Sequence, residues 1–567
     1  MTMEEFRDNL LKYLFVEKKF EEEDAEKQKN MSREEKVENN LLLTNVSIIS
    51  HDGDFYELNV PDNYSKIRVG DKVIIANENT SSEVEATIID VFFDTMTISC
   101  DKELDINAIF TIEQKSPNLL QSLISCLEGI YSGVPGAAFL RLLSGEEKLE
   151  LVDFLKVAID DVPYFDSIKK KLNEEQLNAV SSMLEYPPVH VLQGPPGTGK
   201  TAVLAATAIA TAHMNREVVI IANTHHAVNN ALQKIRSFDK NAVLIKVGAT
   251  LKSEELDDTI LRFEKFNEYY DYSYKNRKKK RTGHIIGMTI WGAIAYLGLR
   301  HHAHFRPYIS LVDEASLMPL TLATILGKTS PSVCLFGDSC QMPPIFRPEL
   351  ESNDNSISIL DYCSQKIGDV PVAVLHTTYR MNNEICSMVS KNFYEPYGIT
   401  LSSGDVAKDR SLCIDVSDCG DDTITEILGS KDSLSIMNVS KEQHEEENSE
   451  EALFAAQIAS VAMQHGMNPK DIAIVTPFRK QVNAIRFAFK YLGYTDEKRP
   501  LVDTVERLQG QDVEMIILSF AVTSPSYYQR VKSFLLNRNR LNVMISRAKT
   551  KVIILKSDII DLDMSFG

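Results

Sequence analysis

The sequence lacks most of the features that mark membrane, secreted and metal-binding proteins. No apolar run approaches the ~20 residues that a membrane-spanning helix requires. Residues 1–8 contain no basic segment followed by an apolar one, so no signal peptide is visible. The eight cysteines form no C-x₂-C pair, which argues against a zinc module, an iron–sulfur cluster or a disulfide framework. We therefore expect an intracellular protein, cytoplasmic or, in a eukaryote, nuclear, and not a secreted one.

An excess of positive charge is missing as well. The chain has 61 Lys and Arg against 80 Asp and Glu, so its formal net charge is −19. This balance does not indicate a nucleic-acid-binding protein, but it does not exclude one, because binding depends on the local field of a groove. A hydrophobic content of 44% and a charged content of 25% are ordinary for a globular protein. The 567 residues suffice for about four domains.

One stretch, residues 189–201, carries the clearest chemical signal. Its sequence VHVLQGPPGTGKT joins a short apolar run to an alanine-rich helical pattern, with the spacing of the phosphate-binding loop of P-loop NTPases. Glycines allow backbone N–H groups to point at phosphate oxygens, and the following helix adds its positive end. Lys200 would reach the β- and γ-phosphates, and the Thr201 hydroxyl would ligate Mg²⁺. We predict that a nucleoside triphosphate contacts Gly194, Pro195, Pro196, Gly197, Thr198, Gly199, Lys200 and Thr201.

Two adjacent acids follow another apolar run, at residues 309–312. Asp313 and Glu314 would stand at the carboxyl end of a strand, which is where open α/β sheets place their sites. Asp313 would then belong to the Mg²⁺ shell with Thr201, and Glu314 would orient or deprotonate the attacking water. A P-loop followed by such a pair predicts that the nucleotide is hydrolysed as well as bound.

The part of the chain before the P-loop changes its hydrophobic period twice. Residues 1–40 have helical spacing and mixed charges, which favours a helical arm that packs against the rest. Residues 41–115 have a period of two, which predicts a small β-barrel with strands at 55–60, 72–75, 84–89 and 95–98. Residues 116–171 return to helical spacing, so we expect the barrel to be carried on a helical stalk.

From residue 172 to the C-terminus, apolar strand candidates alternate with helical or loop sequence. This pattern is typical of parallel sheets with crossover helices. The region is too long for one such sheet, so we predict an α/β fold with two doubly wound parallel-sheet domains, residues 172–345 and 346–567. The predicted strands are 190–192, 218–222, 309–312, 333–336, 372–375, 472–475, 515–520 and 552–555.

The first of these domains contains an insertion at residues 251–281. It is rich in aromatic side chains and ends in a basic run that includes Lys278 and Lys279. Aromatic rings can stack on bases and lysines can neutralise phosphates, so the insertion could grip nucleic acid. A helical hairpin with a solvated cationic end is an equally good interpretation.

In addition to the P-loop, a series of motifs on both sides of it resembles those of superfamily 1 helicases, in the order of that family. DEAS at 313–316 is similar to the acidic motif, and GDSCQMPP at 337–344 is similar to motif III. The remaining matches are LNEEQ at 172–176 (Q motif), ANTHHAV at 222–228 (motif Ia), YRMN at 379–382 (motif IV), ERLQGQD at 506–512 (motif V) and RLNVMISRAK at 540–549 (motif VI). The set resembles the 5′→3′ branch (1B), in the group that contains the nonsense-mediated-decay RNA helicase, the immunoglobulin-mu-binding helicase and senataxin.

The resemblance implies two RecA-like domains with ATP in the cleft between them, and an N-terminal barrel inserted on a stalk. Gln341 would sense the γ-phosphate, and Arg380 and Arg547 would stabilise the charge on the departing phosphoryl group. If both arginines belong to the second domain, catalysis requires the two domains to close on ATP. The implied catalytic residues are Lys200, Asp313, Glu314, Gln341, Arg380 and Arg547, and the ATP site would be completed by Gln176, Tyr379, Gly510 and Asp512.

The same resemblance implies contacts with nucleic acid. We expect them, in addition to the two lysines of the insertion, at Asn223, Thr224, His225, Val228, Thr289, Pro343, Thr476, Pro477 and Arg479. The sequence departs from the family at His225 and His226, where relatives have smaller residues, and at Lys549, where many have arginine. Relatives use the barrel to steer the duplex or strand, which favours the same role here over a purely structural one.

We therefore predict an ATP-dependent, Mg²⁺-requiring helicase or translocase. It would act on single-stranded nucleic acid, or on a duplex with a 5′ single-stranded tail, as a monomer that can have protein partners. DNA is slightly favoured over RNA because no RNA-decay accessory domain is fused. An ATP-gated clamp, or an RNA or ribonucleoprotein remodelling ATPase with little unwinding, would have the same motifs.

Overall fold

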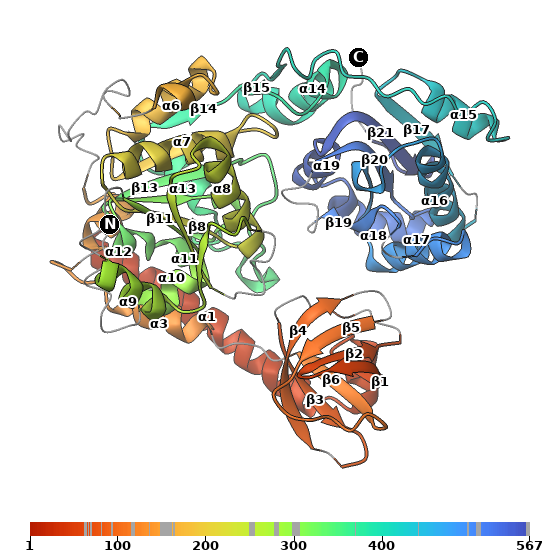
Figure 1. Ribbon diagram of the computed structural model, residues 1–567, viewed down its shortest axis with the longest axis horizontal. Coiled ribbons are helices and arrows are strands. Elements are labelled where there is room, and N and C mark those ends of the chain that lie inside the picture. Colours follow the sequence, from red (N-terminus) through yellow and green to blue (C-terminus); the bar gives the residue numbers. More distant parts are fainter. Residues whose placement is uncertain are drawn as a thin grey trace.

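The computed structural model contains a barrel and two parallel α/β domains (Figure 1). Lys278, Lys279 and Gly510 lie outside the residues that the structure describes, as does most of the motif V string. The described residues are 1–562 except for 62–64, 66, 68–70, 81, 92–94, 115–118, 135, 148–161, 163–164, 249–255, 277–282, 298–306, 369, 440–441, 496–497 and 506–511.

An eight-stranded sheet is the centre of the first α/β domain. Its strands are β7 (Val189–Gln193), β8 (Val218–Ala222), β9 (Val243–Val247), β10 (Leu261–Phe263), β11 (His284–Thr289), β12 (Ile309–Val312), β13 (Ser332–Gly337) and β14 (Val372–Val374). Neighbouring strands pair in parallel in the order β10-β9-β11-β8-β12-β13-β7-β14. The central strands are rich in Val, Ile and Leu and buried along their length, as expected of strands that are covered on both faces.

Helices cover both faces of this sheet because alternate strand residues point to opposite sides. In β8, one set of alternate residues packs against the helices of one face and the other set packs against the opposite face. The first face carries α6 (Glu174–Met183), α7 (Lys200–His213) and α8 (His225–Phe238). The second carries α9 (Phe266–Asn276), α10 (Ile290–Leu297), α11 (Leu320–Ala323), α12 (Leu326–Thr329) and α13 (Ile359–Gln365).

The first domain extends further along the chain than the sequence pattern predicted. Both α13 and β14 lie beyond the predicted break at residue 345, yet β14 pairs with β7, and Ile359 and Leu360 of α13 are buried in the first domain's core. The boundary therefore lies after β14, before β15 (Thr377–Thr378), which pairs with β16 (Ser402–Ser403). The break was misplaced because β14 is a three-residue strand at the sheet edge, with no helical pattern of usual length before it.

The aromatic insertion contributes to the core of the same domain. β10 extends the sheet by pairing in parallel with β9, and α9 buries Phe266 and Tyr269. The Tyr269 hydroxyl forms a 3.1 Å hydrogen bond with Nδ1 of His284 on β11. The rings of Phe266 and Tyr269 are therefore buried packing groups and are not available to stack on bases.

A five-stranded sheet is the centre of the second α/β domain. Its strands are β17 (Leu434–Asn438), β18 (Ile472–Thr476), β19 (Leu501–Thr504), β20 (Val513–Ser519) and β21 (Ala548–Lys556), which pair in parallel in the order β17-β21-β20-β18-β19. One face is covered by α15 (Asp422–Gly429), α16 (Ser449–Gln464) and α17 (Arg479–Tyr491). The other is covered by α14 (Asn383–Val389), α18 (Pro525–Leu535) and α19 (Arg538–Ile545).

The barrel is formed by antiparallel strands near the N-terminus. They are β1 (Leu42–Asp52), β2 (Phe55–Asn59), β3 (Lys72–Asn77), β4 (Glu83–Val91), β5 (Thr95–Ser99) and β6 (Ile109–Gln114), closed in the order β1-β2-β5-β4-β3-β6. Alternate residues point inward, so that Leu58 of β2 and Met96 of β5 meet as partners in a buried core. The sequence pattern had not marked β1 and β6 as strands.

A 28-residue helix, α1 (Met3–Asn30), links the barrel to the first domain (Figure 1). Its first half buries Phe6, Leu10 and Leu14 against α3 (Leu119–Glu128) and α4 (Ala137–Ser144). Its second half leads through α2 (Arg33–Glu38) into β1, and Asp24 pairs with Arg347 at 2.6 Å. The stalk thus includes α1 as well as helices of the predicted segment 116–171, the last of which is α5 (Asp166–Lys169).

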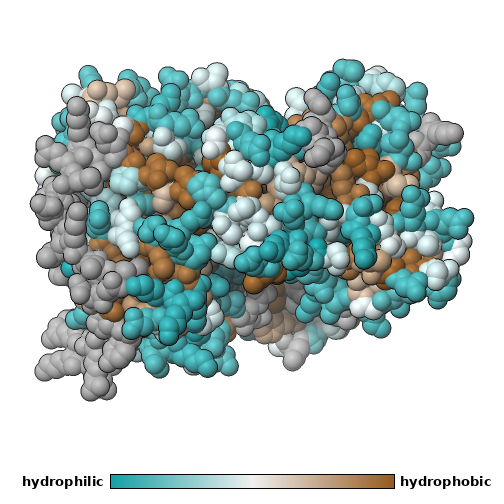
Figure 2. All heavy atoms as spheres, turned by 90° about the horizontal axis from the view of Figure 1, so that it is seen from above, coloured by the Kyte–Doolittle hydropathy of each residue, from teal (hydrophilic) through white to brown (hydrophobic). Residues whose placement is uncertain are grey.

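Polar side chains cover much of the surface seen from above, and hydrophobic side chains gather there in separate patches (Figure 2). In the part of the chain that the structure describes, no helix is long and apolar enough to cross a membrane. The cysteines are free thiols, and the described residues contain no cluster of three or more His, Cys, Asp or Glu side chains that could hold a metal ion.

Candidate active site

A cleft of about 1140 Å³ lies between the two α/β domains. The first domain lines it with the P-loop after β7, with Asn223 and Thr224 after β8, and with the acids after β12. This is the carboxyl edge of the first sheet, where parallel α/β sheets place their ligands. On the other side, the cleft is lined by Tyr379 and Arg380, which follow β15, and by Asp512 and Arg547 of the second domain. The barrel adds Ile67 and Val91.

The P-loop is packed so closely that its glycines cannot be replaced. Gly197 and Gly199 have φ angles of 73° and 88°, which favour glycine. A Cβ on Gly197 would lie 2.5 Å from Cβ of Arg380, and a Cβ on Gly199 would lie 2.5 Å from Nε2 of Gln176. The Lys200 ammonium group donates a hydrogen bond to the Gly194 carbonyl oxygen, so the side chain folds back over its own loop.

The Q motif and motif IV both support this loop. Asn173 caps α6, and Gln176 Nε2 donates to the Thr198 carbonyl oxygen at 2.9 Å. Asn173 Nδ2 donates to the Tyr379 hydroxyl at 2.7 Å, and the Tyr379 backbone N–H donates to the Gly197 carbonyl at 2.8 Å. Gln176 therefore braces the phosphate-binding loop through the Thr198 carbonyl.

The two acids after β12 face the cleft from a sharp turn. Glu314 has a φ of 53°, and its backbone N–H donates to Asp313 Oδ1 at 3.0 Å. Burial raises the pKa of Asp313 to about 7, the negative charge of Glu314 adds to the effect, and Lys200 opposes it. A cation would thus favour the ionised carboxylate. Thr201 lines the same cleft, so a carboxylate and a hydroxyl supply the oxygen donors that Mg²⁺ prefers.

A buried network around Asp338 joins the two domains. Asp338 accepts hydrogen bonds from Gln193 Nε2 at 2.7 Å, Gln341 Nε2 at 2.9 Å and the Tyr394 hydroxyl at 2.6 Å. Asn542 Nδ2 of α19 donates to the same hydroxyl at 2.9 Å and to the Cys340 carbonyl at 2.8 Å. Burial raises the pKa of Asp338, and Lys200 and the hydrogen bonds from Tyr394 and Gln341 oppose the shift. Asp338 and Asn542 lie within the strings matched to motifs III and VI, but no role was predicted for either, and Tyr394 lies outside every matched string; the three meet through tertiary packing.

The two predicted arginines stand next to each other at the second-domain side of the cleft. Arg547 is 4% exposed, and its Nη2 donates to Gln341 Oε1 of the first domain at 3.3 Å. Arg380 donates from Nη1 to the Ser546 carbonyl at 3.0 Å, and its Nε lies 3.8 Å from Asp512 Oδ2. Burial lowers the pKa of both guanidinium groups, that of Arg547 to about 10, and the charge of Arg380 contributes to the shift at Arg547.

Several residues predicted to contact nucleic acid lie at strand ends. Asn223 Nδ2 donates to the Leu317 carbonyl at 2.9 Å, and Thr224 caps α8. His225 begins α8, with its ring next to Gly248. Pro343 is exposed, Pro477 is half-buried, and Arg479 Nη1 donates to the Ser65 carbonyl of the barrel at 2.8 Å.

Three of the predicted contacts are buried instead. Val228 is fully buried in the first domain's core, because α8 turns it, with Ala231 and Leu232, toward the sheet. The Thr476 side chain is also fully buried, and Thr289 is 7% exposed, with its hydroxyl accepting the Gly292 N–H at 3.2 Å. Val228 is therefore a packing residue, and the Thr476 side chain does not reach the surface.

Two family models, both described as an AAA domain, match the chain at residues 171–352 and 356–558. The DNA replication ATP-dependent helicase/nuclease dna2 of Schizosaccharomyces pombe is 25% identical over 407 residues, which cover 68% of this chain and 28% of the relative. The Homo sapiens protein of that description is 24% identical over 526 residues, which cover 87% and 48%. The chain thus spans less than half the length of these two relatives.

A further relative has a different description. DNA polymerase alpha-associated DNA helicase A of S. pombe is 25% identical over 462 residues, which cover 72% of this chain and 66% of the relative. The crystal structure of Arterivirus nonstructural protein 10 (helicase) is 11% identical in sequence, and the alignment covers 91% of this chain and 79% of that protein, with a TM-score of 0.40. Both family models describe AAA domains, and these curated relatives are described as helicases or helicase/nucleases.

Proposed function

We propose that the protein is an ATP-dependent helicase or translocase that moves 5′→3′ along single-stranded nucleic acid, with DNA favoured over RNA. The observation that carries this proposal is the contact of Arg547 with Gln341 across the nucleotide cleft. A nucleotide in this cleft would touch both domains at once, so its binding and hydrolysis would change their relative position. A motor requires that coupling.

Each group in the cleft has a place in the proposed reaction. The P-loop backbone and Lys200 hold the phosphates, and Glu314 orients the attacking water and accepts its proton. Gln341, Arg380 and Arg547 stabilise the negative charge that builds on the departing phosphoryl oxygens. An arginine in this role is worth about 10³–10⁵ in rate. Thr201 and Asp313 would hold Mg²⁺, which neutralises phosphate charge when it is bound.

The strand would follow the carboxyl edge of the first sheet toward the start of α17. The exposed Pro343 and the pair Asn223 and Thr224 lie on the first-domain part of this path. On the other side, Arg479 contacts the barrel through Ser65, so the path passes where the barrel meets the second domain. A strand there would be held between barrel and second domain, which supports a steering role for the barrel.

The descriptions of the relatives support the choice of DNA over RNA. The relatives reported above are described as DNA helicases or as DNA replication helicase/nucleases. Because the chain spans only part of those relatives, substrate preference has to be measured on this protein.

Steady-state ATPase activity is the first test, measured without polymer, with poly-deoxythymidine and with poly-uridine. Unwinding of duplexes with a 5′ or a 3′ tail follows. We expect stimulation by DNA that grows with strand length, and unwinding from the 5′ tail only. Equal stimulation by RNA would move the role toward RNA or hybrid remodelling. ATP turnover that is indifferent to both polymers would contradict the motor and favour a clamp.

A further inference from the structure

The second domain has a groove of about 970 Å³ apart from the nucleotide cleft. It is bordered by α16 and α17, by residues 446–449 and by the link between α2 and β1. Phe487 and Tyr491 stand in it one helical turn apart, with exposures of 66% and 76%. Single exposed apolar side chains are normal, but two large rings line the same groove as Leu453 and Ala484, and grouped apolar side chains of this kind are typical of interaction sites.

Acidic side chains outnumber basic ones around these rings, and one of the basic side chains is in an ion pair. Lys480 pairs with Glu446 at 3.0 Å, and the Arg479 guanidinium donates to the Ser65 carbonyl. Glu38 and Glu447 line the groove, are exposed and have no ion-pair partner among the residues that the structure describes. The groove is thus lined by three acids, Glu38, Glu446 and Glu447, against two bases, Arg479 and Lys480, so the net charge that it presents to a partner is negative.

We propose that this groove binds a basic amphipathic helix of a partner protein. Two apolar side chains of that helix would pack on Phe487 and Tyr491, and its Lys or Arg side chains would face Glu38 and Glu447. The groove runs along α17, whose 13 residues span about 20 Å, enough for three or so turns of a bound helix. Single-stranded nucleic acid could stack on the same rings, but the acids would repel its phosphates.

The probe is a fluorescein-labelled helical peptide with leucine at helical spacing and lysine elsewhere, and the reference peptide replaces each lysine with glutamate. Binding is measured by fluorescence anisotropy at low and raised salt. We expect the basic peptide to bind, F487A/Y491A to weaken it by about tenfold or more, and E38K/E447K to weaken it and reduce its salt dependence. Tyr397→Ala, which removes a ring that is 67% exposed outside this groove, should change nothing.

The variants also have to keep the basal ATPase activity, because none of these residues lines the nucleotide cleft. Equal affinity for the basic and acidic peptides would overturn the proposal. So would basic-peptide affinity that is unchanged in F487A/Y491A. A third contradicting result is that the peptide fails to bind while oligo-deoxythymidine binding falls in F487A/Y491A, which would assign the groove to nucleic acid.

Discussion

The two α/β domains share a parallel-sheet plan but bring opposite kinds of groups to the cleft. The first domain supplies a glycine-rich loop and the two acids after β12, which all lie on one rigid sheet edge. The second supplies guanidinium groups, Arg547 and Arg380, on long side chains that are buried at the interface. The loop and the acids belong to the first sheet, whereas the arginines would act only when the two domains are close. The difference separates nucleotide binding from turnover.

The largest effect is expected from the first domain. Lys200→Ala removes the cation that would face the β- and γ-phosphates, so ATP turnover should fall to background while strand binding without nucleotide is retained. Phosphate release and the anisotropy of a labelled strand measure the two properties. Lys240→Ala, at an exposed position, is the matched control. Normal turnover in Lys200→Ala would show that ATP hydrolysis does not depend on the P-loop lysine.

Arg547→Ala tests the contribution of the second domain to turnover. Its guanidinium contacts Gln341 and is proposed to act only in the transition state, so kcat should fall by about 10³. ATP affinity, measured with a fluorescent nucleotide, should stay close to that of the wild type. Arg530→Ala, which changes an arginine with a 66% exposed side chain, is the control. A loss of ATP affinity as large as the loss of kcat would contradict the assignment of nucleotide binding to the first domain and of turnover to the arginines of the second.

Removing one hydroxyl from the Asp338 network, which joins the two domains, should have a smaller effect, on both stability and turnover. Tyr394→Phe removes the hydroxyl that donates to Asp338 and accepts from Asn542, and it leaves buried polar groups short of partners. The unfolding free energy should fall by about 1–3 kcal/mol in urea titrations, with a reduced kcat. Tyr397→Phe, at an exposed ring, should match the wild type. Unchanged stability and kcat in Tyr394→Phe would show that the network does not couple the domains.

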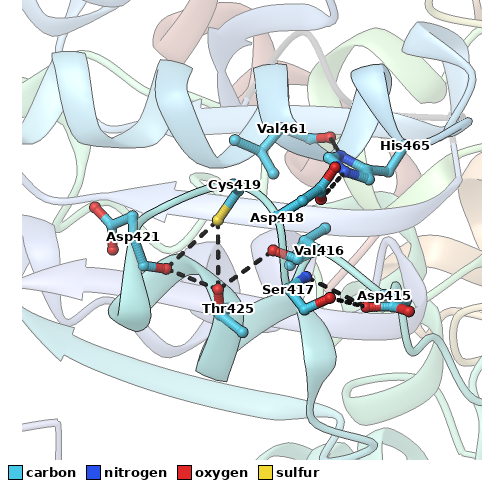
Figure 3. Close-up of polar contacts among 9 residues, drawn as sticks. All are labelled: Asp415, Val416, Ser417, Asp418, Cys419, Asp421, Thr425, Val461 and His465. Carbon is cyan, nitrogen blue, oxygen red and sulfur yellow. Dashed lines mark hydrogen bonds and ion pairs between the residues drawn. The ribbon is translucent and has the colours of Figure 1, made fainter.

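The smallest effect concerns a part of the second domain away from the cleft. His465 Nδ1 lies 2.8 Å from the Val461 carbonyl oxygen and its Nε2 lies 2.8 Å from Asp418 Oδ1 (Figure 3). Both partners are acceptors, so both hydrogen bonds require the imidazolium form. The Val461 hydrogen bond and then Asp418 raise the pKa of His465 above its usual 6.5.

Because the folded-state pKa is raised, the stabilisation by His465 is fully present below about pH 6.5 and is lost as pH rises through the raised value. An NMR titration of the His465 ring should give a pKa above 6.5, and Asp418→Asn should lower it. The pair does not line the nucleotide cleft, so kcat should not follow this titration. A His465 pKa at or below 6.5 would contradict the doubly bonded ring.

Part of the cleft could be predicted because its signals are local. The glycine spacing before α7 and the acids after β12 occupy strand ends, where a few consecutive residues determine the backbone path. Asn542 lies within a motif string, but its contact with Tyr394 exists only because α19 packs against the segment after α14. No local pattern distinguishes Tyr394 from an ordinary core tyrosine, so the Asp338 network could not be predicted.

The missed elements have physical causes of the same kind. β11 was not predicted because Gly287 interrupts its apolar pattern. That glycine is required by packing, since a Cβ there would lie 2.6 Å from Cγ1 of Val228. The same contact explains why Val228 is a core residue rather than a nucleic-acid contact. β9 was also missed; a fully buried lysine, Lys246, interrupts its apolar pattern.

The most direct test of the central claim is a double-mutant cycle between Gln341 and Arg547, with kcat and ATP affinity measured for Gln341→Ala, Arg547→Ala and the double variant. If the second domain's arginine acts through the first domain's sensor, the two losses in kcat will not add, and the coupling energy will be about 0.5–3 kcal/mol. Strictly additive losses would contradict the claim that the two domains complete one catalytic site.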